Sequence, residues 1–479
     1  MRFFYACLAI FLIMSSAVSI ASADEGAIVT FWPLFDYRSS PATTYSNLAI
    51  LGPIFKRERS GGTTKTAFRP FFFNVSTPES DDSDILYPIA STSSGGSDSD
   101  TQVMKIYQKH VSRTGTSEER RETMLFPFYI SGRSEKHGSY SSFFPLHGDI
   151  YERFWRDEYH YTLFPAYSRT VKNGTTTTNW LYPLFSAVSG EKESGFQFWP
   201  FFGQAAKEGV YAKRFLLWPF YTSESLGLNS DSPTENRYLL PFYASSASPQ
   251  RSSNYIPWPL CGVVKDGKGE VIERDIFWPF WMTANGKDSS TRRYLPFYAE
   301  SHLKESSSRW LMWPIYRHER IDSASFRQEK TNLLYFLFNR SDESWPESGK
   351  DRARSAFWPL YVWKREDNGV RTLSVPALIE TVVQNDGVER NWAPLWRLFT
   401  IQWNAQGNNA ASLFWNLYWH EQRGEELAWE LSPLIAYSST AGGSELLILK
   451  GLFGHSAGKD TTSITLLWVT FGLQNKSSK

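Results

Sequence analysis

Phe198-Trp199-Pro200-Phe201-Phe202 is the clearest copy of a short motif that recurs along this chain: two apolar residues, a proline, an apolar residue and an aromatic residue. The next copy, Leu217-Trp218-Pro219-Phe220-Tyr221, follows about twenty residues later, a spacing that indicates a repeat architecture. Further copies lie at residues 31–35, 277–281 and 357–361. The repeat therefore determines the fold, as a long series of similar units.

The residues of the motif favour β-strand over α-helix. Proline lacks a backbone N–H and its ring clashes with the preceding helical turn, whereas aromatic and β-branched residues suit a pleated sheet. Turn signals such as Asn173-Gly174, Asn285-Gly286 and Asp386-Gly387 separate the copies, and such pairs tolerate tight hairpin turns. We therefore predict that each repeat is one strand of about 10–14 residues with the proline near its middle, followed by a short turn.

Short turns between such strands predict an all-β antiparallel meander of about 20–24 strands. A proline in mid-strand removes one hydrogen bond from the ladder, so we expect a bent or irregular belt at that level. Phe336 and Asn416 replace the proline in degenerate copies, and residues 102–108 hold only a remnant of the motif. The polar stretches 91–100 and 341–352 are predicted to be longer loops.

A sheet with this many strands exposes two edges unless it closes on itself. Closure as a large β-barrel is favoured by the strand number and the tight turns, although the apolar stretch is shorter than the about 9–11 residues of a membrane-spanning strand. The β-propeller is the alternative, because its blades pack on both faces. An open meander covered by a second layer is the third option.

The first residues are typical of a signal peptide. Arg2 supplies a positive charge, residues 3–20 are largely apolar, and Ala21-Ser22-Ala23 offers a small-residue cleavage site. We therefore expect residues 1–23 to be removed on export and residues 24–479 to form a single repeat-built domain. Cys261 is the only cysteine of that domain, so no disulfide can form within it.

Charge and aromatic content restrict the classes of partner. The net charge is +1 with acids and bases mixed along the chain, which gives no electrostatic reason to expect nucleic acid binding. Aromatic residues make up 16% of the chain, and exposed aromatic rings bind sugars or lie at membrane interfaces. Because most of them occupy the repeat, packing is their favoured role. Better candidates for exposure lie outside the motif, at Trp345, Trp363, Trp403 and Trp419.

One segment matches a catalytic motif. Residues 454–458, Gly-His-Ser-Ala-Gly, fit the Gly-x-Ser-x-Gly pattern of a hydrolase nucleophile elbow. That motif acts at a strand-to-helix turn with a histidine later in the chain, whereas here a strand-like stretch follows and no histidine lies beyond His455. We therefore interpret the segment as a hairpin turn and predict no catalytic residue there.

Metal and cofactor motifs are equally weak. His318 and His420 each precede a glutamate, but no paired histidine spacing appears. The acidic patches 81–84 and 97–100 lack the glycine and terminal glutamate of a calcium loop, so we expect solvated loops. The sequence predicts no metal, no cofactor and no catalytic site, and it assigns no ligand-binding residue.

These patterns together indicate an exported cell-envelope β-repeat protein with a non-catalytic structural or channel-like role. Its favoured form is an outer-membrane β-barrel, with outer-membrane lipid as its partner. The alternative is a soluble periplasmic or secreted propeller-like module that binds a polysaccharide or a protein.

Overall fold

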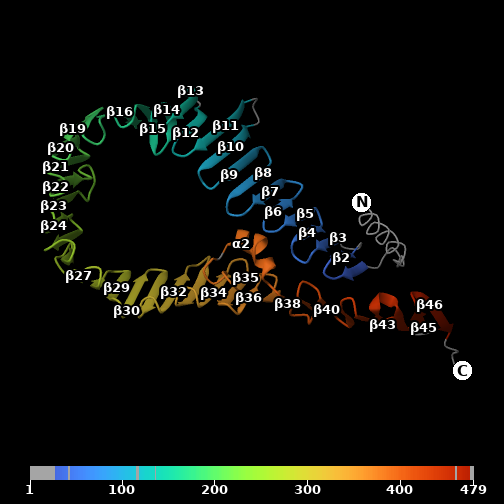
Figure 1. Ribbon diagram of the computed structural model, residues 1–479. Coiled ribbons are helices and arrows are strands. Elements are labelled where there is room, and N and C mark those ends of the chain that lie inside the picture. Colours follow the sequence, from blue (N-terminus) through green and yellow to red (C-terminus); the bar gives the residue numbers. More distant parts are fainter. Residues whose placement is uncertain are drawn as a thin grey trace. The chain divides into compact units, whose positions relative to one another are not determined.

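The computed structural model describes residues 27–40, 44–114, 118–134, 136–383, 385–458 and 461–474, so the predicted signal peptide lies outside the described residues. The chain divides into two compact units. The first unit combines the residues up to Ser93 with those from Tyr335 onward, and the second unit is Ser94–Leu334. Both units are built almost entirely of short β-strands (Figure 1).

The predicted all-β antiparallel meander is confirmed. The described residues form one sheet of 46 strands, and strands that are consecutive in the chain pair with each other within each unit. Among the described residues no ladder joins the last strand back to the first, so the expected closure as a barrel is not made by hydrogen bonds. The continuous pairing also differs from the separate four-stranded blades of a propeller.

The first unit begins with β1 (Ala27–Phe31), β2 (Phe35–Ser40), β3 (Tyr45–Ile50), β4 (Phe55–Ser60), β5 (Thr63–Phe68), β6 (Phe72–Ser76) and β7 (Ser80–Ile85), and β8 (Ala90–Gly95) crosses the boundary between the units. The first unit resumes with β34 (Phe338–Trp345), β35 (Lys350–Phe357), β36 (Tyr361–Arg365), β37 (Arg371–Val375), α2 (Asp386–Asn391), η2 (Ala393–Leu395), β38 (Phe399–Trp403), β39 (Asn409–Leu413), β40 (Tyr418–Arg423), β41 (Glu426–Leu431), β42 (Ile435–Thr440), β43 (Gly443–Ile448), η3 (Leu449–Gly451), β44 (Phe453–Gly458), β45 (Thr461–Leu466) and β46 (Val469–Gln474).

The second unit contains β9 (Asp98–Val103), β10 (Tyr107–Thr114), β11 (Glu118–Leu125), β12 (Tyr129–Ser134), β13 (Gly138–Phe143), β14 (His147–Arg153), β15 (Arg156–Thr162), β16 (Tyr167–Lys172), β17 (Thr175–Trp180), β18 (Phe185–Gly190), β19 (Glu193–Phe198), β20 (Phe202–Lys207), β21 (Tyr211–Leu216), β22 (Tyr221–Leu226), β23 (Thr234–Leu239), β24 (Tyr243–Ala247), β25 (Arg251–Tyr255), β26 (Cys261–Asp266), β27 (Val271–Ile276), β28 (Trp281–Asn285), β29 (Ser289–Tyr294), β30 (Tyr298–Leu303), β31 (Ser306–Leu311), β32 (Tyr316–Asp322) and β33 (Arg327–Leu333).

Each proline motif is a turn between two strands and not the middle of one strand. Phe198 ends β19 and pairs with Phe202, which begins β20. The connection is Trp199-Pro200-Phe201, closed by a hydrogen bond from the amide of Phe201 to the carbonyl of Phe198 at 2.9 Å, with a cis peptide before the proline as in a type VI turn. The predicted mid-strand proline and irregular belt are therefore wrong, because a proline inside the ladder would cost a hydrogen bond that it does not cost in a turn.

The number of repeats was predicted well, but the number of strands was not. Each repeat of about twenty residues gives two strands, so the sheet has 46 strands rather than 20–24. The strands are also shorter than predicted, from five residues in β1 to eight in β10. The predicted loops at 91–100 and 341–352 are instead hairpins, formed by β8 with β9 and β34 with β35. Polar residues suffice there because many of these side chains remain exposed.

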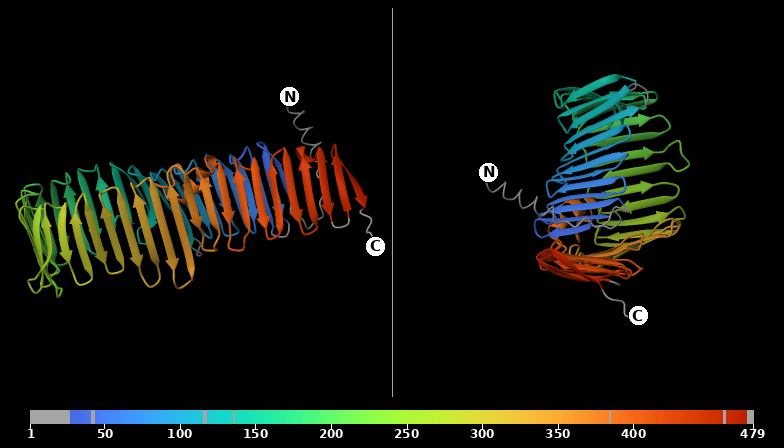
Figure 2. Two further views of the ribbon diagram at one scale, coloured as in Figure 1. Left: turned by 90° about the horizontal axis from the view of Figure 1, so that it is seen from below. Right: turned by 90° about the vertical axis from the view of Figure 1, so that its right-hand side faces the viewer.

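The turns line two different edges of the sheet. Strands lie side by side with a turn at each end, so consecutive turns alternate between the two edges (Figure 2). All proline motifs consequently lie along one edge, which we call the aromatic edge. The glycine-rich and charged turns between the motifs lie along the other, the polar edge.

Packing within the sheet takes place between neighbouring strands. Phe215 on β21 covers Gly203 on β20, where an added Cβ would lie 2.3 Å from the ring. Tyr255 covers Gly262 in the same way, with a Cβ at 2.1 Å. The absence of a side chain at these glycines lets an aromatic ring lie flat on the next strand. The repeats are therefore stabilised mainly by their sequence neighbours, as in other repeat proteins.

Cross-strand ion pairs add a pH dependence to this stability. Glu300 on β30 lies directly opposite Arg309 on β31, and Arg309 Nη2 donates to Glu300 Oε1 at 2.7 Å. The Tyr298 hydroxyl donates to the other carboxylate oxygen at 2.7 Å. The hydrogen bonds from Arg309 and then from Tyr298 lower the pKa of Glu300 from 4.5 to about 2.

We expect this cluster to lose its stabilising effect in acid. Because the pKa of Glu300 is lower in the folded state, its contribution is present above pH 4.5 and disappears as the pH falls from 4.5 to about 2. Hydrogen exchange of β29–β31, corrected for intrinsic rates, should show increased opening over that range. The Glu300→Gln variant should lack this pH dependence. An identical acid profile in that variant would contradict the assignment.

Candidate functional site

The aromatic edge of the second unit carries no charge over most of its length. It consists of the turns at residues 126–128, 144–146, 163–166, 181–184, 199–201, 217–220, 240–242, 256–260, 277–280, 295–297 and 312–315. None of these residues is Asp, Glu, Lys, Arg or His. Lys105, in the degenerate turn between β9 and β10, is the exception at the start of the unit. The pattern is one of charge exclusion repeated in turn after turn.

Side chains of this edge are exposed because the turns extend beyond both faces of the sheet. Phe242 and Phe297 are 68% and 66% exposed. Exposed large apolar side chains occur in every one of these turns, including Phe128, Leu146, Leu163, Leu181, Phe201, Phe220, Trp258, Phe280 and Met312. A contiguous apolar surface of this extent marks an interaction site on a folded protein.

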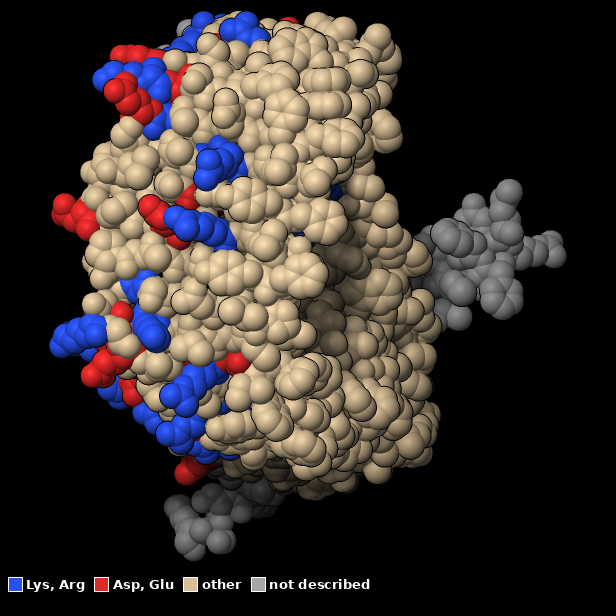
Figure 3. All heavy atoms as spheres, turned by 90° about the vertical axis from the view of Figure 1, so that its left-hand side faces the viewer, with Lys and Arg blue, Asp and Glu red and all other residues tan. Residues whose placement is uncertain are grey.

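The polar edge of the second unit has the opposite character. Its turns include the charged pairs Glu191-Lys192 and Lys304-Glu305 and the segment 267–270. On the face of the molecule shown in Figure 3, Lys, Arg, Asp and Glu gather on one side and leave the other side uncharged. Aromatic residues also occur in polar-edge turns, at Phe154, Trp155 and Phe326, and Trp155 is 89% exposed. The ribbon is therefore amphipathic from edge to edge.

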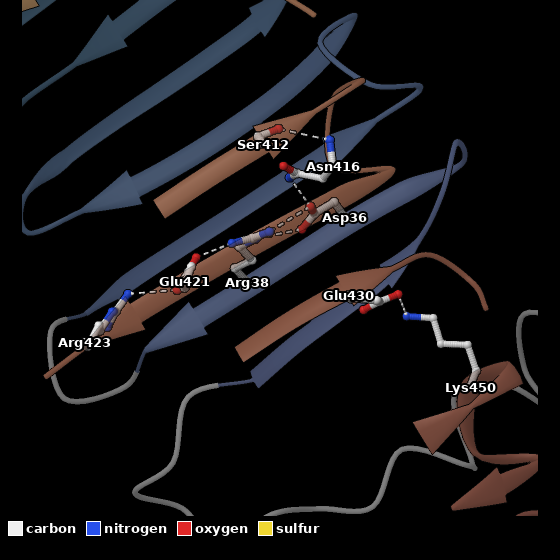
Figure 4. Close-up of polar contacts among 8 residues, drawn as sticks. All are labelled: Asp36, Arg38, Ser412, Asn416, Glu421, Arg423, Glu430 and Lys450. Atoms are coloured by element: carbon white, nitrogen blue, oxygen red, sulfur yellow. Dashed lines mark hydrogen bonds and ion pairs between the residues drawn. The ribbon is translucent and has the colours of Figure 1, made fainter. Parts of the chain in front are cut away.

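The first unit departs from this rule in the long connection between β37 and β38, which holds Glu380, Asp386, Glu389, Arg390 and Arg397, and in two short turns. Arg69 and Lys450 occupy turns of its aromatic edge, but both side chains bind protein groups. Arg69 is buried and donates to the carbonyls of Arg390 at 2.8 Å and Pro53 at 2.9 Å, and burial lowers its pKa to about 10. Lys450 pairs with Glu430 (Figure 4). Neither charge is offered to the surroundings of the edge.

Strands from the two ends of the chain lie face to face in the first unit. Arg38 on β2 is held between Asp36, whose Oδ1 lies 3.2 Å from Arg38 Nε, and Glu421 on β40 (Figure 4). The guanidinium also lies over the Trp419 ring, 4.7 Å from its centroid. The side-chain amide of Asn416, in the turn before β40, donates a hydrogen bond to Asp36. Residues two apart in a strand lie on the same face of the sheet. Asp36 and Arg38 therefore lie side by side on β2, and Trp419 and Glu421, which both contact Arg38, lie side by side on β40.

A polar cleft opens beside this cluster. Its volume is about 780 Å³, and its lining includes small hydroxylated residues from both ends of the chain, among them Ser39, Ser412 and Ser438. Arg38, Glu421, Arg423 and Glu426 contribute the charges of its lining. Such a lining can form hydrogen bonds with a hydroxyl-rich ligand.

Helix α2 is fixed to β7 by an ion pair between Arg390 and the buried Asp84. Asp84 is 2% exposed and accepts hydrogen bonds from Arg390 Nε at 2.7 Å and Asn391 Nδ2 at 2.8 Å. The helix begins after Asn385, whose side chain caps the amide of Gly387 and accepts the Tyr87 hydroxyl at 2.7 Å. These contacts have a structural role, since each polar atom named is used within the protein.

Two buried glutamates complete this region. Glu380 is fully buried and accepts from Trp396 Nε1 at 3.0 Å. Glu389 binds Arg397 and, at 2.9 Å, Lys364. Burial alone would raise the pKa of Glu389, but the two cations outweigh it and lower that pKa. The Glu389 carboxylate is thus held as an anion by these two protein cations.

The hydrolase-like segment forms no nucleophile elbow. Its residues belong to strand β44, where Ser456 pairs with Glu445 on one side and Ser463 on the other. Our interpretation as a hairpin turn was therefore wrong in detail, since the segment is a strand. A serine in mid-strand lacks the strained strand-to-helix turn that exposes a catalytic nucleophile.

The histidine and acidic candidates are dispersed. His318 contacts Thr331 at 3.1 Å, and His420 contacts Asn409 at 2.9 Å. The acidic patches are largely strand residues of β7 and β9 and not the expected loops. In the part of the chain that the structure describes, no three His, Cys, Asp or Glu side chains are grouped to hold a metal ion.

The exposure of the tryptophan side chains is the reverse of what we predicted. Trp419 is only 5% exposed beneath Arg38, and Trp345, Trp363 and Trp403 are half-buried. Motif residues such as Trp313 are exposed instead. The prediction was wrong because it placed the motif in the middle of a strand, whereas its turn position leaves the rings uncovered.

Sequence reasoning missed one acidic cluster on the second unit. Asp275 on β27 is buried, accepts the Tyr255 hydroxyl at 3.1 Å, and has one carboxylate oxygen without a partner. Burial raises the pKa of Asp275, and it raises that of Tyr255 to about 12 together with the nearby carboxylates. The strand pairing brings these residues together from positions twenty apart, so no local motif could have revealed them.

No protein-family model matches the chain, and a search of curated proteins finds no match. Across the described residues, no helix has the length and apolar character needed to cross a membrane. The function is therefore inferred from the residues and their geometry.

Proposed function

We propose that this chain is an exported cell-envelope β-repeat protein with a non-catalytic, structural role at the outer membrane. The observation that carries the proposal is the edge-to-edge segregation of an uncharged aromatic edge from a polar edge. The sequence of residues 1–23 supplies the export signal that this location requires.

A structural role agrees with how the charged groups are used. Arg38, Asp84 and Glu380 are all engaged in contacts that tie strands or segments of the first unit together. Catalytic groups are instead held in a cleft with perturbed pKa values and room for a substrate. The Asp275 cluster has perturbed pKa values, but it does not line the cleft of the first unit.

The channel-like form of this proposal is a β-barrel whose strands cross the outer membrane. Strands of five to eight residues extend about 16–27 Å before any tilt, while a spanning strand needs about 9–11 residues. Strand length therefore supports a scaffold more than a channel.

The polar cleft of the first unit supports the second candidate, a soluble exported module that binds a polysaccharide. Its serine-rich lining, with charged groups among the serines, suits hydroxyl groups. This candidate does not use the aromatic edge, which is why we place it second.

Cell fractionation tests the proposal. We expect the chain to be recovered with outer membranes and to begin near Asp24, as judged by mass spectrometry of its N-terminal peptide. Recovery in the periplasmic extract would favour the soluble alternative. Recovery in the cytoplasm with residues 1–23 attached would contradict export altogether.

A further inference from the structure

The aromatic edge has the properties of a surface that enters lipid. We propose that the aromatic edge of the second unit lies in the interfacial region of one leaflet of a lipid bilayer, without crossing it. The inference deepens the proposed function by naming lipid as the partner of this edge. It rests on the proposed function only for the identity of the membrane, which is the outer membrane.

Charge is the first argument. Moving a charged side chain from water into the acyl region is costly, so a lipid-facing surface must exclude Asp, Glu, Lys and Arg. The eleven turns from 126–128 to 312–315 contain none of these residues, although 21% of the chain is charged. The uncharged edge thus complements the uncharged boundary of the hydrocarbon.

Backbone polarity is the second argument, because lipid cannot pair with free amide or carbonyl groups. Successive turns of the edge bond to each other: Leu217 N donates to Phe201 O at 2.6 Å and Trp218 N to Pro200 O at 2.7 Å. The same pattern recurs where Trp313 N donates to Pro296 O at 2.7 Å. Each of the eleven turns also contains a proline. Proline has no backbone N–H group, so it has no donor that would lose a hydrogen bond to water on entering lipid.

Depth is the third argument, and it sets the mode of binding. The uncharged zone comprises the turn and the first residue pair of the hairpins, for example Leu216 with Tyr221, with His147 in the pair beside the 144–146 turn as the exception. It is about 7–10 Å deep on the spacing of strand residues. Interfacial elements enter membranes by about 5–10 Å, whereas the hydrocarbon core is about 30 Å thick.

Residue type agrees with that depth. Tyrosine and tryptophan prefer the level of the lipid headgroups, where one end of the ring is wet and the other apolar. Tyr182, Trp218, Trp278 and Trp313 lie in these turns among Phe and Leu side chains, and all four are exposed. The edge therefore combines interfacial anchors with purely apolar residues.

A fluid partner fits this edge better than a protein. Neighbouring aromatic turns are two strand spacings apart, which is about 10 Å. The eleven turns from 126–128 to 312–315 therefore extend over about 100 Å along the edge. A protein groove would need matching pockets over that whole length, while lipid adapts to any contour. The edge also consists of turns and offers no unpaired strand for β-augmentation by another chain.

The test compares two triple variants of the full-length protein with matched chemistry. Phe220→Glu, Phe242→Glu and Phe280→Glu place three charges on the aromatic edge, and Phe154→Glu, Trp155→Glu and Leu228→Glu place them on the polar edge. All six side chains are exposed large apolar residues. Each protein is diluted from mild detergent into phosphatidylcholine vesicles, and the fraction that floats with lipid is measured.

We expect the unmodified protein and the polar-edge variant to float alike, and the aromatic-edge variant to bind at least about tenfold less. Adding phosphatidylglycerol should change little, since Lys105 is the one basic residue in the described turns of this edge. Equal flotation of both variants, or no flotation of the unmodified protein, would overturn the proposal. A dimer that the aromatic-edge variant dissociates, without vesicle binding, would assign the edge to a second copy and also overturn it.

Two further readouts keep the test decisive. If the aromatic-edge variant does not fold, brominated lipids applied to the unmodified protein should quench tryptophan fluorescence, and absence of quenching would overturn the proposal.

Fractionation separates this inference from the proposed function. A cytoplasmic chain that binds vesicles would refute export alone, whereas an outer-membrane chain indifferent to aromatic-edge charges would refute lipid contact alone.

Discussion

Replacing Arg38 with methionine should destabilise the first unit by about 3 kcal/mol, because breaking a largely buried ion pair leaves uncompensated charge behind. The side chains of Arg38, Asp36 and Glu421 are 15%, 7% and 20% exposed. Without the guanidinium, the two carboxylates would face each other across the contact between β2 and β40. Methionine retains most of the apolar contact with Trp419, so the loss should come from charge and not from packing.

Hydrogen exchange measured by mass spectrometry is the appropriate readout, since a long repeat protein does not unfold as one two-state unit. Amides of β2 and β40 should exchange roughly a hundredfold faster in the Arg38→Met variant, the equivalent of about 3 kcal/mol. Strands of the second unit should be unaffected. These local rates would show whether the ends of the chain are joined through this residue.

Arg423→Met is the matched control. Arg423 also contacts Glu421, at 3.4 Å, but its side chain is 73% exposed. Exposed ion pairs contribute about 0–1 kcal/mol, so exchange in β2 and β40 should change less than about fivefold. Equal effects of the two substitutions would mean that Arg38 does not hold the two layers together.

The class of fold could be read from the sequence, but the position of the motif in the fold could not. Aromatic and β-branched residues at a twenty-residue period predict antiparallel strands, and the structure has them. A period of that length fits one long strand with a turn or two short strands with two turns. Proline itself favoured the second choice, because Pro200 in a ladder would break a hydrogen bond and in a turn breaks none.

The wrong position of the motif within the strand explains the wrong predictions of side-chain exposure. With the motif in mid-strand, Trp218 and Phe242 would be packed, and residues outside the motif, such as Trp419, would be free. In the turn the motif residues have no layer above them, while Trp419 lies in the interior beneath Arg38. The spacing between copies fixed the number of repeats and left the direction of each side chain open.

Long-range contacts were beyond the sequence for a different reason. Arg38 and Glu421 are separated by 383 positions and Asp84 and Arg390 by 306. No pattern in a single sequence relates such residues. Exclusion of charge from the motif, by contrast, was visible from the start, and only the turn geometry gave it a meaning.

The distance between residues 192 and 208 tests most directly whether each proline motif is a turn. Both residues lie on the polar edge, on either side of the Pro200 hairpin, and the amide of Glu208 donates to the carbonyl of Lys192 at 2.8 Å. In a single extended strand centred on Pro200, the sixteen residue-to-residue steps from 192 to 208 would span about 53 Å.

Spin labels at Lys192→Cys and Glu208→Cys, in a background where Cys261→Ser removes the native thiol, measure this distance by double electron–electron resonance. We predict a distance below about 25 Å, allowing for the two label arms and the strand spacing. A distance near 50 Å would place the proline motif in mid-strand, and the aromatic edge would then not exist.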